Sequence, residues 1–148
     1  MPATTLEILK MPHPMLRQKC DQVATKEVIY ATGLSMIETM HDNRGVGLAA
    51  PQVGLALDLF VMRMGDEDKI CYQPRIIEKS KKLSNHLEEC LSIPGVQVSV
   101  SRPRRIKVSF SDGHATTVMD LSHLEARVFQ HELDHLNGVL IIDHFFKQ

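Results

Sequence analysis

The sequence predicts an α+β fold, with antiparallel or mixed sheets around a helix near the C-terminus and one further helix near the N-terminus. Apolar residues recur with the 3.6-residue period of a helix in residues 25–41 and again in residues 122–137. Short strand-like runs fill most of the chain between these two helices. Because 148 residues suffice for one hydrophobic core, we expect a single domain over residues 1–148.

The N-terminal helix is expected to begin after Thr25, a residue type that caps helices well, and to end near His41. Its apolar positions follow helical spacing and comprise Ile29, Gly33, Met36, Ile37 and Met40. Its methionines are interpreted as core residues, because flexible thioether side chains fill irregular gaps in cores. A loop of small residues, 43–52, follows the helix.

Strands are expected between the helices, at 58–63, 69–72, 75–78, 96–100, 105–111 and 115–119. In the fourth of these runs, Val96, Val98 and Val100 alternate with polar residues and should share one face. Turns are predicted at residues 64–68 and 111–113, and a solvated strand end or turn at residues 78–82.

The C-terminal helix has clear start and stop signals. The sequence Ser122-His123-Leu124-Glu125 matches the S-x-x-E capping box, and Gly138 stands where a helix commonly ends in the left-handed conformation. On a helical wheel, one narrow stripe carries Leu124, Val128, His131 and His135, and Glu132 lies beside it.

Residues 131–135 form an H-E-x-x-H pattern, which places two imidazoles on one helix face within reach of one metal ion. A catalytic site needs a third protein ligand and an open position for water. Ile141 occupies the place where a longer protease motif carries a third histidine, so the ligand should lie upstream. The upstream candidates are His13, His41, His86, Glu88, Glu89, Cys90 and His114. A thiolate is attractive because it lowers the net charge of a divalent site, but Cys90 could equally be a core residue.

Composition and sequence pattern argue against several classes of protein. The net charge of −1 and the 5% of aromatic residues do not favour nucleic-acid binding. No apolar run approaches the length of a membrane span, and the N-terminus lacks the features of a secretion signal. Three cysteines without C-x-x-C spacing indicate a reducing compartment, so a cytoplasmic protein is expected.

Three segments, in order, resemble the three signature motifs of the peptide deformylases. They are Gly45-Val46-Gly47-Leu48-Ala49-Ala50-Pro51-Gln52, Glu88-Glu89-Cys90-Leu91-Ser92 and Gln130-His131-Glu132-Leu133-Asp134-His135. Residues 12–17 and 136–140 also look similar to the family, so the resemblance covers nearly the whole chain.

The resemblance implies a metal-dependent hydrolase that removes the N-formyl group from N-formylmethionyl nascent polypeptides and releases formate. It implies Cys90, His131 and His135 as ligands of one divalent ion, natively Fe(II), for which Zn, Ni or Co can substitute. Glu132 would be the general base and acid. The Gln52 side-chain amide and the Leu91 backbone N–H would stabilise the oxyanion.

The resemblance also implies a substrate-binding surface. Backbone groups near Val46, Gly47 and Glu89 would pair with an extended peptide. The methionine side chain would enter an apolar pocket, in which we place Val46, Leu124 and Val128. Gly45 and Gly47 would allow close backbone approach. Two residues, Glu88 and Arg102, are expected to support the site by an ion pair.

The chain departs from the pattern of the family at two positions. Glu89 stands where the second motif normally has glycine, and Gln97 stands where arginine is common. Both changes concern substrate preference more than chemistry. The chain resembles a short form of the enzyme without a C-terminal helical extension, which leaves contact with the ribosome open.

The sequence leaves two alternative functions open. One is a catalytically silent module of the same fold that binds a metal. The other is an H-E-x-x-H metalloprotease, which would need the third ligand downstream that this chain lacks.

Overall fold

The structure is a computed structural model that describes residues 4–145, so the two ends of the expected domain lie outside it. Its elements, in order, are η1 (Pro14–Arg17), α1 (Lys26–Asp42), β1 (Gly47–Ala49), η2 (Ala50–Val53), β2 (Leu59–Met64), β3 (Glu67–Lys79), β4 (Leu83–Cys90), β5 (Ile93–Pro103), β6 (Arg105–Ser111), β7 (Thr116–Ser122), α2 (His123–Leu136) and α3 (Ile141–Phe145). The strands form an antiparallel five-stranded sheet, β1-β2-β3-β6-β7, and a separate antiparallel ribbon, β4-β5. The predicted α+β class is therefore confirmed.

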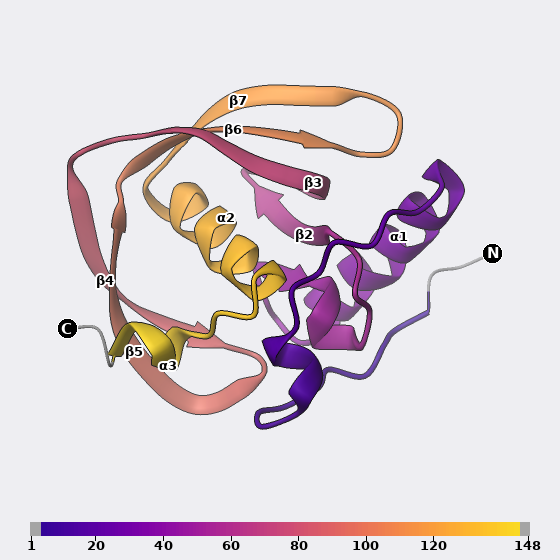
Figure 1. The fold of residues 1–148 in the computed structure, drawn as a ribbon, viewed down its shortest axis with the longest axis horizontal. Coiled ribbons are helices and arrows are strands. Elements are labelled where there is room, and N and C mark those ends of the chain that lie inside the picture. Colours follow the sequence, from indigo (N-terminus) through magenta and orange to yellow (C-terminus); the bar gives the residue numbers. More distant parts are fainter. Residues whose placement is uncertain (1–3, 146–148) are drawn as a thin grey trace.

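Strand β2 is buried on both faces, which explains its continuous apolar run. Phe60 and Met62 belong to the core that contains α2, whereas Leu59 and Val61 belong to the core that contains α1. The two helices therefore cover opposite faces of the five-stranded sheet. Figure 1 shows α2 near the centre of the molecule, between this sheet and the β4-β5 ribbon. No helix in the described part of the chain is long and apolar enough to cross a membrane.

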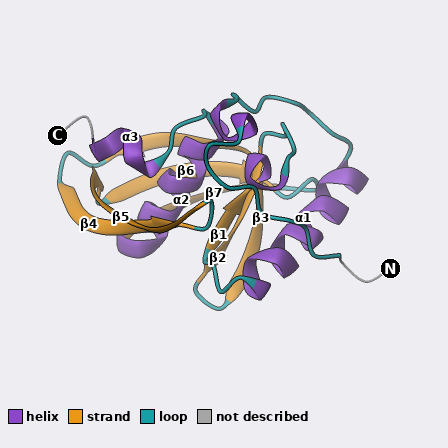
Figure 2. Ribbon diagram, turned by 90° about the horizontal axis from the view of Figure 1, so that it is seen from below, coloured by secondary structure: helices purple, strands orange, loops and turns teal. Residues whose placement is uncertain are grey.

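A third, smaller core lies under the β4-β5 ribbon. It consists of Leu16, Cys90, Ile93, Val98, Val100, Leu140 and Ile141. Ile141, which replaces the histidine of a longer metal motif, is buried in this core. Figure 2 shows the short helix α3 beside the ribbon. The ribbon thus brings Cys90, at the end of β4, against the interior of the molecule.

Helix α1 forms as predicted. The Thr25 hydroxyl accepts a hydrogen bond from the Val28 amide at 3.3 Å, and both Met36 and Met40 are fully buried. A Cβ at Gly33 would lie 2.5 Å from Cδ1 of Ile70, so glycine allows α1 to pack directly on β3. The interpretation of the methionines as core residues is confirmed.

The strand predictions need three corrections. The runs at 69–72 and 75–78 belong to one strand, β3, in which Gln73 has φ of 50° and the register with β6 shifts between Tyr72 and Arg75. This bulge lets one strand bend while its pairing continues. Residues 47–49 of the expected loop form β1. Residues 83–89, for which the pattern indicated no strand, form most of β4, whose polar side chains are largely solvated.

Helix α2 lies where it was predicted, with Asn137 as its C-cap and Gly138 at φ of 72°. The predicted capping box does not form. Ser122 is the N-cap residue, but its side chain makes no capping hydrogen bond. The helix follows directly on β7, and the left-handed φ of 53° at His123 bends the chain there. The strand therefore dictates the entry geometry in place of the capping side chain.

Candidate metal centre

Three potential ligands converge from two elements. Cys90 ends β4, while His131 and His135 lie one turn apart on α2. Their donor atoms lie within 4.8 Å of one another, and the Cys90 Sγ is 3.3 Å from Nε2 of His135. Among the upstream candidates for a third ligand, Cys90 is the one that joins the two histidines. The remaining candidates lie outside this group of ligand atoms.

Glu88 holds His131 in place instead of acting as a ligand. Its Oε1 is 2.9 Å from Nδ1 of His131, which leaves Nε2 of that ring for a metal. The Arg102 guanidinium grips the same carboxylate at 2.6 and 2.9 Å, and Arg127 donates to it at 2.5 Å. The predicted pair of Glu88 and Arg102 is present and is buried. Burial alone would raise the pKa of Glu88, but its hydrogen bonds with His131 and Arg102 outweigh this and hold that pKa well below its usual range.

The two imidazoles differ in proton affinity when no metal is present. Burial opposes charge on both rings. For His131, hydrogen bonds with Cys90 and Glu88 outweigh burial and raise its pKa to about 10. For His135, burial and the neighbouring charge of His131 place the pKa well below its usual value. Since a metal binds neutral imidazole, metal binding is coupled to loss of a proton from His131.

Glu132 lies beside the metal ligands and is almost completely buried. It is 4% exposed, and burial raises its pKa to about 7. A Cβ at position 47 would lie 2.6 Å from Oε2 of Glu132, so glycine lets β1 pass directly over the carboxylate. Gly47 therefore allows β1 to pack closely on Glu132 of α2, and the close approach to substrate expected for Gly45 and Gly47 stays a prediction.

The residues present fit a divalent transition metal. One thiolate and two imidazoles are a common donor set for such ions and leave a coordination position open. Oε1 of Glu132 is buried and has no hydrogen-bond partner among the described residues. Buried carboxylate oxygens rarely stay unpaired, so this atom fits a hydrogen bond to a water or substrate at the centre.

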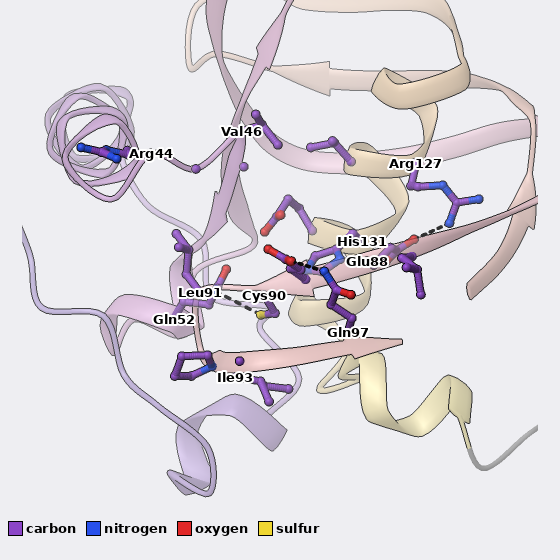
Figure 3. Close-up of a pocket in the computed structure, with 18 of the residues that line it drawn as sticks. Arg44, Val46, Gln52, Glu88, Cys90, Leu91, Ile93, Gln97, Arg127 and His131 are labelled. Atoms are coloured by element: carbon purple, nitrogen blue, oxygen red, sulfur yellow. Dashed lines mark hydrogen bonds and ion pairs between the residues drawn. The ribbon is translucent and has the colours of Figure 1, made fainter. Parts of the chain in front are cut away.

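The metal centre opens into a cavity of about 580 Å³. One wall is residues 44–47, before and within β1, and the opposite wall is residues 87–91 of β4 and the turn after it. Leu124 and Val128 line it from α2, so all the residues predicted to bind substrate face one space. Figure 3 shows Val46, Cys90 and His131 around this cavity. Arg102 is outside the lining, behind Glu88.

Gln52 is oriented by a network that sequence alone does not show. Its Oε1 accepts from the Ala49 amide at 2.9 Å. This directs its Nε2 to Oγ of Ser92 at 3.1 Å and to Sγ of Cys90 at 3.8 Å. Leu91 follows Cys90 and lines the cavity, and its carbonyl accepts from the Lys10 ammonium at 3.0 Å. Both predicted oxyanion donors thus belong to residues at the metal centre.

Sequence reasoning missed Arg127, and it assigned no role to Ser92 of the second motif. Arg127 stands four residues before His131 on α2, and it bonds Glu88 and the Val100 carbonyl. The same helical spacing that revealed the histidines could have indicated it. The contact of Ser92 with Gln52 gives no such signal, because it depends on tertiary structure.

Comparison with known proteins agrees with this geometry. The model of the family described as polypeptide deformylase matches residues 5–148. The chain is 43% identical over 145 residues to a peptide deformylase of Borreliella burgdorferi, covering 95% of this chain and 87% of the relative. It is 44% identical over 132 residues to that of Thermotoga neapolitana, covering 88% and 80%.

Solved structures show the same similarity. The crystal structure of peptide deformylase from Thermotoga maritima superposes with a TM-score of 0.91 at 41% identity, covering 95% of this chain and 97% of that chain. The enzyme from Synechococcus elongatus superposes with a TM-score of 0.90 at 34% identity, covering 97% and 80%. The cysteine and two histidines form a metal site of the type typical of these enzymes. The chain therefore belongs to the polypeptide deformylase family, and its function is that of a peptide deformylase.

Proposed function

We propose that this chain hydrolyses the formamide of N-formylmethionyl peptides, with Cys90, His131 and His135 holding one divalent ion. The observation that carries the proposal is the convergence of these three ligands beside the unpartnered oxygen of Glu132. When bound, the ion supplies Lewis acidity, which activates water and polarises a carbonyl. Fe(II) is the ion proposed for the native enzyme, and Zn, Ni or Co can replace it.

Glu132 moves the proton in this proposal. Its carboxylate accepts a proton from the attacking water as the new C–O bond forms. It then returns that proton to the departing nitrogen as the C–N bond breaks, giving formate and a free amine. Gly47 packs closely on the Glu132 carboxylate, and the Glu132 side chain is buried. Bulk water is therefore kept from competing for this carboxylate.

Gln52 and Leu91 stabilise the negative charge that develops on the formyl oxygen. The Gln52 side chain is held in place by the Ala49 amide and Ser92, so its Nε2 lies at the centre before a substrate binds. The Leu91 N–H is carried by the same backbone that positions Cys90. Three further residues act indirectly, by orienting His131. They are Glu88, Arg102 and Arg127.

The peptide binds between two strand edges. β1 is the edge strand of the five-stranded sheet, and β4 pairs only with β5 among the described strands. The cavity lies between residues 44–47 and residues 87–91, so an extended peptide there can add backbone hydrogen bonds to both walls. Val46, Leu124 and Val128 provide apolar contacts for the methionine side chain.

The proposed substrate also indicates where the enzyme acts. We propose that residues 1–148 act as one catalytic domain in the cytoplasm, on chains emerging from the ribosome. Direct contact with the ribosome is not required by the site. The Synechococcus relative was crystallised with actinonin, and we propose that this chain binds the same compound in its cavity.

The test is formate release from formyl-Met-Ala-Ser by protein prepared anaerobically with Fe(II) or loaded with Ni(II). We expect metal-dependent release. Cys90→Ala should lose most of the metal, whereas Cys90→Asp should retain a measurable share, because a carboxylate can replace the thiolate as an anionic ligand. Bound metal without formate release would favour the catalytically silent module. Tight metal binding by Cys90→Ala would contradict the ligand assignment.

A further inference from the structure

We infer that the Glu89 side chain selects the second residue of the substrate and favours lysine or arginine after the formylmethionine. The inference rests on the proposed function, because it concerns the same cavity. It assigns a role to the two positions, Glu89 and Gln97, at which the chain departs from the family pattern. In the structure, these two residues contact each other.

The contact lies where the β4-β5 pairing is interrupted. Glu88 pairs with Val98 and Cys90 pairs with Ile93, so Glu89 alone lies opposite the four residues 94–97. Nε2 of Gln97 donates to Oε1 of Glu89 at 2.5 Å across this irregularity. Both residues line the cavity and both are exposed. The Gln97 amide therefore holds the Glu89 carboxylate at the exposed part of the cavity lining, which we call the mouth. Because an amide is neutral, this hydrogen bond does not compensate the negative charge of Glu89.

The pleat of β4 determines which substrate residue meets Glu89. Glu88 and Cys90 are buried toward α2, whereas Leu87 and Glu89 are exposed on the opposite face. An extended peptide along this edge alternates its side chains in the same way. If methionine points inward toward Val128, the next side chain points outward, toward the face that carries Leu87 and Glu89.

The other charged side chains that line the cavity form no ion pair with Glu89 in the described part of the chain. Glu88 is compensated by Arg102 and Arg127, and Lys10 donates to the Leu91 carbonyl. Figure 3 shows Arg44 beside the end of α1, away from Gln97. Among the described residues, no cationic side chain forms an ion pair with Glu89. A cation at the second position of the peptide would supply that partner, and an anion there would be repelled.

The expected selectivity is modest, because the carboxylate is exposed. Exposed ion pairs change affinity by a factor of about two to five, and salt screens them. The Lys-to-Glu preference at the second residue should therefore be about fivefold or somewhat more at low ionic strength, and should shrink toward one in high salt.

The experiment compares kcat/KM for formyl-Met-Lys-Ser, formyl-Met-Ala-Ser and formyl-Met-Glu-Ser at about 0.02 M and about 0.5 M NaCl. We expect the order Lys, Ala, Glu in the wild type at low salt. Glu89→Gln should bring the Lys-to-Glu ratio close to one, and Glu89→Lys should invert it. Because the ratio is measured within each variant, a general loss of activity cancels.

Two further variants separate a local effect from a general one. Gln97→Arg places a cation beside Glu89 and should also bring the ratio close to one. Glu38→Gln removes an equal charge from the exposed face of α1, outside the cavity, and should keep the wild-type ratio. A wild-type ratio near one, or a Glu89→Gln ratio equal to that of the wild type, overturns the inference. Absence of formate from all three peptides overturns the proposed function as well, which distinguishes the two failures.

Discussion

Glu88 and Glu89 are neighbours in sequence, yet they belong to two different regions of the site. Glu88 is 6% exposed at the inner end of the cavity, where two guanidinium groups and His131 share its carboxylate. Glu89 is exposed at the mouth, where the Gln97 amide is its hydrogen-bond partner. The alternation of the strand sends one carboxylate inward and the other outward.

This difference between Glu88 and Glu89 separates the residues that serve the reaction from those that select the peptide. At the inner end, Cys90 and His135 are buried, and the buried carboxylate of Glu88 holds His131 through a hydrogen bond. At the mouth, side chains such as Leu124, which is 66% exposed, are free to contact whatever peptide enters. Substitutions at the inner end should therefore affect turnover and stability, while those at the mouth should affect which peptide is processed.

The largest effect is expected for Glu132→Ala. Loss of the general base should lower kcat by about 10²- to 10⁴-fold, because Glu132 is the carboxylate whose unpartnered oxygen lies beside the metal ligands. Metal content, measured by atomic absorption, should stay at the wild-type level, since Cys90 and the histidines remain. Glu125→Ala on the same helix, outside the cavity, is the matched control and should retain turnover. Near-normal turnover by Glu132→Ala would assign the proton transfer to another group.

An intermediate effect is expected for Glu88→Gln. The change leaves Arg102 and Arg127 buried without their shared anion, and breaking a buried pair in this way costs about 3–5 kcal/mol. It also loosens His131, so metal affinity should fall by about 10- to 100-fold. Urea unfolding and competition with a chelator measure the two effects. Glu89→Gln is the control next to it and should change stability by less than about 0.5 kcal/mol. Equal effects at the two positions would remove the distinction between the inner end and the mouth.

The smallest effect is expected for Leu124→Ala. Loss of part of an apolar wall should raise KM for formylmethionyl peptides by about three- to tenfold and leave kcat nearly unchanged, because the contact is the same in the ground and transition states. Leu83→Ala removes another exposed leucine, from the start of β4 and outside the cavity, and should leave KM unchanged. A fall in kcat for Leu124→Ala would mean that the mouth also positions the reacting group.

Sequence reasoning predicted best where a short segment determines its own structure. Thr25 and Gly138 begin and end their helices as predicted, because helix ends depend on a few adjacent residues. It was wrong at the capping box of Ser122, where the preceding strand constrains the backbone. It also divided β3 into two, because the residues around Gln73 have the composition of a strand end but form a bulge.

The candidate site shows the same division. The spacing within residues 131–135 was sufficient to place two imidazoles and a carboxylate at one metal centre, since positions four apart on a helix share a face. Residues alone left the third ligand open among several candidates, and resemblance to the family selected Cys90. Only the tertiary structure places the Cys90 thiol against His135, directs Gln52 through Ser92, and joins Glu89 to Gln97. Those contacts depend on how β4, β5 and α2 pack, and packing between segments far apart in the chain is not encoded in any local pattern.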